Sequence, residues 1–158
     1  MITSVIIAIM ATCASFYFSA QQQTANAEAA INHLQQLLIT AQLQAIKDNI
    51  PVTVCALNTA DDCSGDWNSP ITAFTEHQKI QQVSLLKDNN AELSFSGFPT
   101  SRYLTVTPLG LAGQQNGTFV YCRRYGSELI LRGLSISRTG RMRVLKQNDP
   151  YFKDTHIC

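Results

Sequence analysis

The most conspicuous group of side chains that could do chemistry lies near the C-terminus and is basic. Between Arg123 and Lys146 the chain has seven basic residues and a single acid, Glu128. The seven are Arg123, Arg124, Arg132, Arg138, Arg141, Arg143 and Lys146. The planar guanidinium group of arginine stays ionised and donates bidentate hydrogen bonds to phosphate oxygens. This group of residues therefore makes phosphate recognition the first chemical hypothesis for the chain.

The spacing around Gly140 places several of these arginines together. Arg141 and Arg143 are two residues apart, so on a β-strand their side chains point to the same face. Gly140 allows the preceding turn conformations that other residues rarely adopt, and Arg138 approaches from the opposite arm of that turn. The candidate DNA-binding residues are Arg138, Gly140, Arg141 and Arg143, with Lys146 as an auxiliary phosphate contact.

A purely structural interpretation of the same arginines stays open. Charged side chains on an exposed edge strand prevent edge-to-edge aggregation without binding any ligand. Elsewhere, no nucleophile, base and acid form a recognisable set. There is no CxxC motif, and His33, His77 and His156 are scattered along the chain. The sequence therefore predicts no enzyme, no metal site and no cofactor.

Composition excludes a disordered chain, and its charge is unevenly distributed. Of the 158 residues, 45% are hydrophobic and 15% are charged, which suits one folded domain. Residues 1–101 carry three basic and eight acidic side chains, a net charge of −5. Residues 102–158 carry nine basic and three acidic side chains, a net charge of +6. Such asymmetry between the two parts of a chain indicates a polyanionic partner.

The N-terminal segment has the composition of a membrane anchor. Residues 1–27 contain no charged side chain, and an apolar run from Val5 continues through Phe18. About twenty apolar residues in a helix span the roughly 30 Å hydrocarbon core of a bilayer. A cleaved signal peptide would start with basic residues, and this segment has none. We therefore predict a transmembrane helix over residues 1–23, the alternative being a buried helix of a soluble domain.

The same helix is predicted to continue as an amphipathic segment over residues 24–50. Apolar residues recur at spacings of three and four, which places them on one helical face. They are Ala27, Ile31, Leu34, Leu38, Ala41 and Ala45. Gln35, Gln42 and Lys47 lie on other faces, and Pro51 stops the helix. The amphipathic half must therefore pack its apolar face on a folded domain.

After Pro51 the hydrophobic pattern changes to a period of two, which predicts a β domain over residues 51–158. The candidate strands are Val52–Leu57, Ile71–Thr75, Ile80–Leu86, Glu92–Ser96, Tyr103–Thr107, Thr118–Arg123, Leu129–Leu134 and Met142–Leu145. Asn116-Gly117, directly before one of them, predicts a tight hairpin. The predicted fold class is α+β, with a long N-terminal helix packed on a C-terminal antiparallel β-sheet or sandwich.

Aromatic residues mark the expected core of the β domain. Trp67 is predicted to anchor the loop after Cys63, and Tyr103, Phe119 and Tyr121 alternate with smaller residues, as core positions of strands do.

Five cysteines indicate the compartment. Cys13 lies inside the apolar run and is expected to be a free thiol. Cys55, Cys63, Cys122 and Cys158 form an even set in a domain that follows an anchor, which indicates an oxidising environment. Of the three possible pairings, we expect Cys55–Cys63, which closes a short loop, and Cys122–Cys158, which ties the last residue to a strand.

Several segments, in this order, resemble the GspH/FimT family of minor pseudopilins, which occur in type IV pili and type II secretion systems. Residues 2–10 resemble the stretch after the prepilin cleavage site, and residues 41–55 resemble the junction between the helix and the first strand. Residues 63–67 carry the family's CxxDW pattern, and residues 134–143 resemble its C-terminal signature. Residues 140–143 match the GRxR motif of the DNA-binding FimT branch.

The resemblance implies a minor pseudopilin of a type IV pilus system. Its GRxR turn would bind extracellular double-stranded DNA, largely without sequence preference, for uptake in natural transformation. The alternative is a structural, GspH-like minor pseudopilin that primes or caps a pilus or a type II secretion pseudopilus and binds only protein. Either function implies contacts with other pilins through the N-terminal helix. It also implies a single-pass inner-membrane anchor with a periplasmic domain, and a place on the surface of a Gram-negative cell when assembled.

The family pattern also predicts residues upstream of Met1. Pilins carry a short basic leader and then a Gly-Phe-Thr-Leu-Ile-Glu-like run, and Met1 matches the position just past that glutamate. Mass spectrometry of the mature protein is therefore expected to find an N-terminus upstream of Met1. A functional pilus subunit whose authentic N-terminus is Met1 would contradict this expectation.

Overall fold

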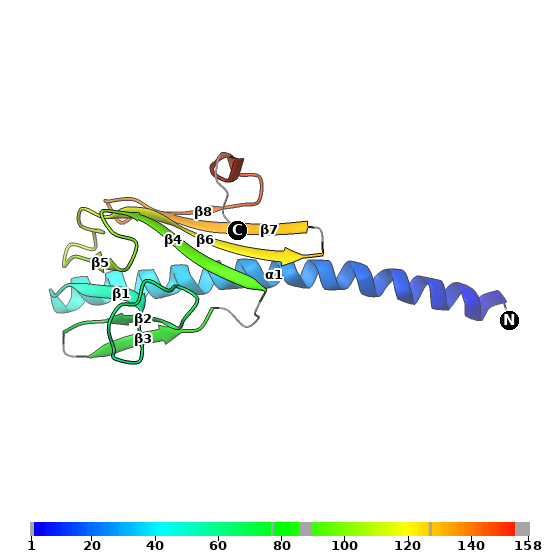
Figure 1. The fold of residues 1–158 in the computed structure, drawn as a ribbon, viewed down its shortest axis with the longest axis horizontal. Coiled ribbons are helices and arrows are strands. Elements are labelled where there is room, and N and C mark those ends of the chain that lie inside the picture. The colour runs from blue at the N-terminus through cyan, green and yellow to red at the C-terminus, as the bar shows by residue number, and fades with distance from the viewer. Residues whose placement is uncertain (1, 77, 86–89, 127, 154–158) are drawn as a thin grey trace.

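A single long helix, α1 (Ile2–Asp48), organises the molecule. The computed structural model describes the backbone of residues 2–76, 78–85, 90–126 and 128–153, and their side chains from residue 21 onward. The prediction of one nearly continuous helix is confirmed, and α1 projects well beyond the β domain at its N-terminal end (Figure 1). Within the described part of the chain, no helix combines the length and apolar character needed to cross a membrane.

The C-terminal half of α1 buries one face in the β domain, as its amphipathic pattern predicts. All six residues predicted for this face are at most 1% exposed, and Ala30 and Leu37 extend it. The face packs against strands of both sheets, so the helix forms the centre of a common core. The helix ends at Asp48, and Asn49 follows with a left-handed φ of 54°, a common way to terminate a helix.

Two antiparallel four-stranded sheets flank α1, with strand orders β3-β2-β1-β5 and β4-β6-β7-β8. The strands are β1 (Val52–Ala56), β2 (Ile71–Phe74), β3 (Lys79–Val83), β4 (Ala91–Phe98), β5 (Leu104–Val106), β6 (Asn116–Tyr125), β7 (Glu128–Ile136) and β8 (Met142–Leu145). A 3-10 helix, η1 (Pro150–Lys153), follows β8. All eight predicted strands are present, seven with shifted ends and Met142–Leu145 with the predicted ends. Leu86, at the end of one predicted strand, lies outside the described residues. The α+β fold class is confirmed.

The hairpin predicted at Asn116-Gly117 is wrong. Both residues lie inside β6, where they pair with Phe98 and Gly97 of β4. A Cβ atom at position 117 would lie 2.6 Å from the ring of Phe95 and from the carbonyl oxygen of Ser96. Glycine is needed here to let an aromatic ring approach the backbone, not to form a turn.

The aromatic core confirms three of the four expected core positions, Trp67, Phe119 and Tyr121. Trp67 is 3% exposed and makes edge-on contacts with the rings of Phe95 and Phe119, at centroid distances of 5.3 and 5.0 Å. Tyr121 is also buried. Tyr103 is 40% exposed, because Leu104 and Val106 are the inward positions of β5 and the alternation turns residue 103 outward.

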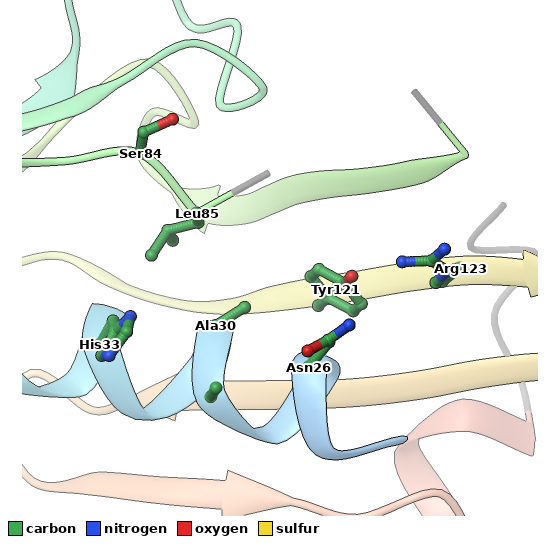
Figure 2. Close-up of a pocket in the computed structure, with 8 residues that line it drawn as sticks. Asn26, Ala30, His33, Ser84, Leu85, Tyr121 and Arg123 are labelled. Atoms are coloured by element: carbon green, nitrogen blue, oxygen red, sulfur yellow. The ribbon is translucent and has the colours of Figure 1, made fainter. Parts of the chain in front are cut away.

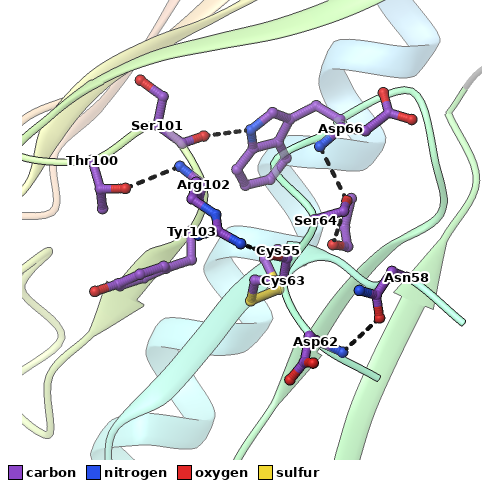
Figure 3. The surroundings of a disulfide bond; sticks show 12 residues. Cys55, Asn58, Asp62, Cys63, Ser64, Asp66, Thr100, Ser101, Arg102 and Tyr103 are labelled. Carbon is purple, nitrogen blue, oxygen red and sulfur yellow. Dashed lines mark hydrogen bonds between the residues drawn. A yellow bond between two sulfur atoms is a disulfide. The ribbon is translucent and has the colours of Figure 1, made fainter. Parts of the chain in front are cut away.

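A disulfide bond joins Cys55 of β1 to Cys63 in the following loop, which is the first pair expected from the sequence (Figure 3). Arg102 secures the same loop from outside, since its Nη2 donates a hydrogen bond of 3.0 Å to the carbonyl oxygen of Cys63. Cys122 is also disulfide-bonded. Cys158 lies outside the described residues, so the pair Cys122–Cys158 stays a prediction.

Non-reducing peptide mapping of the oxidised protein is expected to find Cys55 linked to Cys63 and Cys122 linked to Cys158. The Cys122→Ser variant should lose about 2–4 kcal/mol of unfolding free energy, because the bond restricts the unfolded chain. Cys13→Ser is the matched control and should unfold like the wild type. A free thiol at Cys158 in protein isolated without reductant would contradict the second pairing.

Candidate nucleic-acid interface

The predicted GRxR turn connects β7 to β8 and is closed by backbone hydrogen bonds. The amide of Gly140 donates to the carbonyl oxygen of Ser137 at 2.9 Å, and the amide of Ser137 donates to the carbonyl oxygen of Arg141 at 3.0 Å. Gly140 has a φ of +76°, which favours glycine. Arg138 and Thr139 occupy the exposed corner positions of this turn. The backbone that presents the arginines is therefore well defined.

The turn is fastened to the C-terminal part of α1 by one side chain. The Nε2 atom of Gln42 donates to the carbonyl oxygen of Gly140 at 2.9 Å and to that of Gly110 at 3.1 Å. A Cβ atom at position 140 would lie 2.5 Å from the carbonyl oxygen of Gly110. Gly140 is thus required both for its φ and for the space it leaves. Sequence analysis placed Gln42 on the polar faces of the helix and missed this role, because no local pattern marks hydrogen bonds to two distant loops.

The three arginines differ in their partners. Arg138 in the turn and Arg141 directly before β8 are exposed, and neither forms an ion pair within the described residues. Arg143 lies within β8, and its Nη2 is 2.8 Å from the Oδ2 of Asp149. The Arg143 side chain is nevertheless 65% exposed. The turn therefore presents two unpaired guanidinium groups and one that an acid already contacts.

Lys146 is not brought to the same face of the sheet as Arg143. Alternation along the strand puts Arg143 and Lys146 on opposite faces, and Lys146 lies on the side of α1. There it lines a groove of about 200 Å³ together with Glu28 and Arg132, which form an ion pair of 3.1 Å. The structure therefore separates Lys146 from the arginine turn.

A small cleft between α1, the segment after β3 and β6 contains another of the basic residues (Figure 2). Arg123 lines it together with Asn26 and His33 and is only 8% exposed. The cleft volume is about 80 Å³. Pockets that bind small molecules usually have volumes of about 300 Å³ or more, so this cleft is too small for such a ligand. Because it is buried, Arg123 does not contribute to a basic surface with the other arginines.

The family model described as "Type II transport protein GspH" matches residues 30–140. This chain belongs to the GspH family. The match covers most of the amphipathic part of α1, the CxxDW segment and the turn up to Gly140. It ends before Arg141, so it does not test the arginines that follow or the FimT branch of the family. No curated protein sequence matches the chain.

Solved structures show the same fold in a minor pilin and a minor pseudopilin. The type IV minor pilin FimU of Pseudomonas aeruginosa is similar over 81% of this chain and 92% of its own, with 17% identity and a TM-score of 0.58. A second crystal form of FimU gives a TM-score of 0.53 at 19% identity, over 75% of this chain and 91% of its own. The minor pseudopilin EpsH of the Vibrio cholerae type 2 secretion system matches over 78% of this chain and 98% of its own, with 18% identity and a TM-score of 0.55. This GspH-family chain thus has the minor pilin fold.

The Gly140→Ala variant is expected to unfold more easily than Gly126→Ala. Both glycines have positive φ values, +76° and +58°, but a Cβ at position 126 would meet nothing within 4 Å. Gly126→Ala should therefore cost about 1 kcal/mol of unfolding free energy from backbone strain alone. Gly140→Ala should cost about 3 kcal/mol, because the clash with the Gly110 carbonyl is added. Urea unfolding curves measure both values, and equal losses would contradict the close packing of Gly140 against Gly110.

Proposed function

We propose that this GspH-family protein is a minor pseudopilin of a type IV pilus system that binds extracellular double-stranded DNA through the turn at residues 137–141. The main observation that supports this proposal is that Arg138 and Arg141 are exposed and form no ion pair among the described residues. Both lie on a turn that Gln42 fastens to α1. A fixed backbone reduces the entropy lost when the arginines engage phosphates. Exposed, rigidly presented guanidinium groups are what phosphate recognition requires.

The contact with Asp149 leaves Arg143 able to take part. A guanidinium group has five N–H donors, and the ion pair with Asp149 engages Nη2 alone. Arg143 can therefore add a third phosphate contact beside Arg138 and Arg141. Two or three neutralised phosphates predict a log–log salt dependence of affinity with a slope of about −2 to −3. Such a small footprint implies weak binding, of micromolar order or poorer.

The place of the turn in the molecule suits capture of DNA outside the membrane. The C-terminal end of α1, to which the turn is bonded, lies at the opposite end of the molecule from the N-terminus (Figure 1). If residues 1–23 anchor the protein in the inner membrane, the turn faces the periplasm, or the cell exterior after assembly with other pilins. Several copies along a filament would strengthen weak capture through effective concentration.

A structural minor pseudopilin that binds only protein is the second candidate, and two observations favour it. Gly140 is explained by packing against Gly110, and Arg143 is explained by its ion pair with Asp149. Two residues of the GRxR motif therefore have structural reasons to be present. Arg138 and Arg141 have no such reason within the described residues, so they discriminate between the two functions.

Replacing Arg138 and Arg141 with glutamine is expected to weaken binding of duplex DNA at least tenfold at low salt. The slope of log affinity against log salt should become shallower by about 1.8, since two phosphate contacts are lost. The fold should persist, because exposed charges contribute little stability. Arg→Lys changes at both positions should restore only part of the affinity, since lysine lacks the bidentate fork. Fluorescence anisotropy with the full chain in detergent measures these effects, and circular dichroism checks the fold.

The matched control replaces Lys79 and Arg124 with glutamine. Both side chains are exposed and lie away from the turn, and the net charge changes by the same amount. This variant should bind almost as the wild type does. Equal affinity of the wild type and the Arg138/Arg141 variant would refute the site, and no binding by the wild type would favour the structural pseudopilin.

A further inference from the structure

A second turn, at residues 107–111, has the same build as the arginine turn. The amide of Gly110 donates to the carbonyl oxygen of Thr107 at 2.8 Å, and the amide of Thr107 donates to that of Leu111 at 2.8 Å. The hydroxyl of Thr107 also donates to the Leu111 carbonyl, at 3.2 Å, as Ser137 does to Arg141 at 3.3 Å. The φ of the closing glycine is +74°, close to the +76° of the other turn. The protein therefore carries two matching turns.

Gln42 joins these two turns side by side. Its amide nitrogen uses both N–H donors, one on each closing glycine carbonyl. Their backbones are close enough that a methyl group on Gly140 would clash with Gly110. Ile46 lies on the same side of α1 and would meet a Cβ at position 110 at 2.8 Å. The turns therefore form one rigid tip at the C-terminal end of α1.

Corresponding positions of the two turns carry polar or basic side chains in one turn and apolar side chains in the other. The corner residues Arg138 and Thr139 of one turn correspond to Pro108 and Leu109 of the other. The residue after the closing glycine is arginine in one and leucine in the other. Leu109 is 78% exposed, more than any other large hydrophobic side chain in the described part of the chain. The tip thus presents a basic turn and an apolar turn next to each other.

We propose that both turns bind the duplex together. The arginines contact the phosphates that border the minor groove, and Pro108 and Leu109 enter the groove and pack on sugar and base edges. This proposal rests on the proposed function and names the groove and the apolar contact. Minor-groove proteins combine basic side chains with apolar wedges, among them proline and leucine. The cyclic side chain of Pro108 and the two backbone hydrogen bonds hold Leu109 in place, so little order is lost on binding.

The geometry also predicts a DNA preference. Pyrimidine–purine steps such as TA unstack most easily, and narrow A·T-rich minor grooves attract arginine through their enhanced negative potential. A wedge at Leu109 should therefore favour duplexes that contain TA steps over G·C-only duplexes of equal length. A purely phosphate-bound turn would bind both duplexes alike.

The test compares Leu109→Ala with Leu43→Ala in the full chain, with the Arg138/Arg141 double glutamine variant alongside. Leu43 on α1 is 63% exposed, so Leu43→Ala is the control that also removes an exposed leucine side chain. Leu109→Ala is expected to bind the TA-containing duplex about tenfold more weakly, because the apolar contact is lost. Its salt slope should equal that of the wild type, since no phosphate contact is removed. Leu43→Ala should bind like the wild type, and netropsin, which occupies the minor groove, should displace the protein.

The possible results separate this proposal from the proposed function. If the arginine variant loses affinity and Leu109→Ala does not, the wedge is wrong and DNA binding through the turn stands. Undiminished binding to netropsin-saturated DNA would likewise overturn the wedge alone. If the wild type does not bind DNA, both proposals fail. Circular dichroism of each variant shows whether a loss of affinity reflects a loss of fold.

Discussion

The side-chain amide of Gln42 is the interaction on which the tip of this molecule depends. Its two N–H groups satisfy the carbonyl oxygens of Gly110 and Gly140, which belong to loops far apart in the sequence. Each loop is closed internally, and this amide bonds the two loops to each other and to α1. Gln42 lies on α1 beside Leu38, Ala41 and Ala45, which are fully buried. Because these neighbours are packed in the core, the position of Gln42 and of the tip bonded to it is well fixed. The exposed side chains of both loops are thereby presented in one fixed arrangement.

The same core explains the sequence patterns that mark the family. The CxxDW segment is structural here, since Cys63 closes a loop through its disulfide and Trp67 fills the core beside Phe95 and Phe119. The indole N–H of Trp67 is also satisfied, by a hydrogen bond of 2.7 Å to the carbonyl oxygen of Ser101. A buried tryptophan with its N–H paired stabilises the region without any ligand. The CxxDW segment of this chain therefore has a structural reason to be present.

The residues that indicate a function are those that packing inside the protein does not explain. Gly140 and Arg143 have partners inside the protein, so their presence alone does not indicate DNA binding. Arg138, Arg141 and Leu109 extend into solvent from backbones that are held in place. Exposed charges and exposed leucines contribute little to folding stability. The proposed ligand, a duplex whose minor groove is bordered by phosphates and lined by sugar and base edges, would account for all three.

The sequence by itself determined the helix, the eight strands, the Cys55–Cys63 pair and the basic turn, because these depend on local periodicity and on residues close along the chain. Only the tertiary structure decided which basic residues stay together. Arg123 is buried in a cleft, and Lys146 lies on the opposite face from Arg143, since strand register and the packing of α1 determine both positions. The pairing of two distant turns through Gln42 was equally invisible, because a hydrogen bond between residues 98 positions apart leaves no periodic trace.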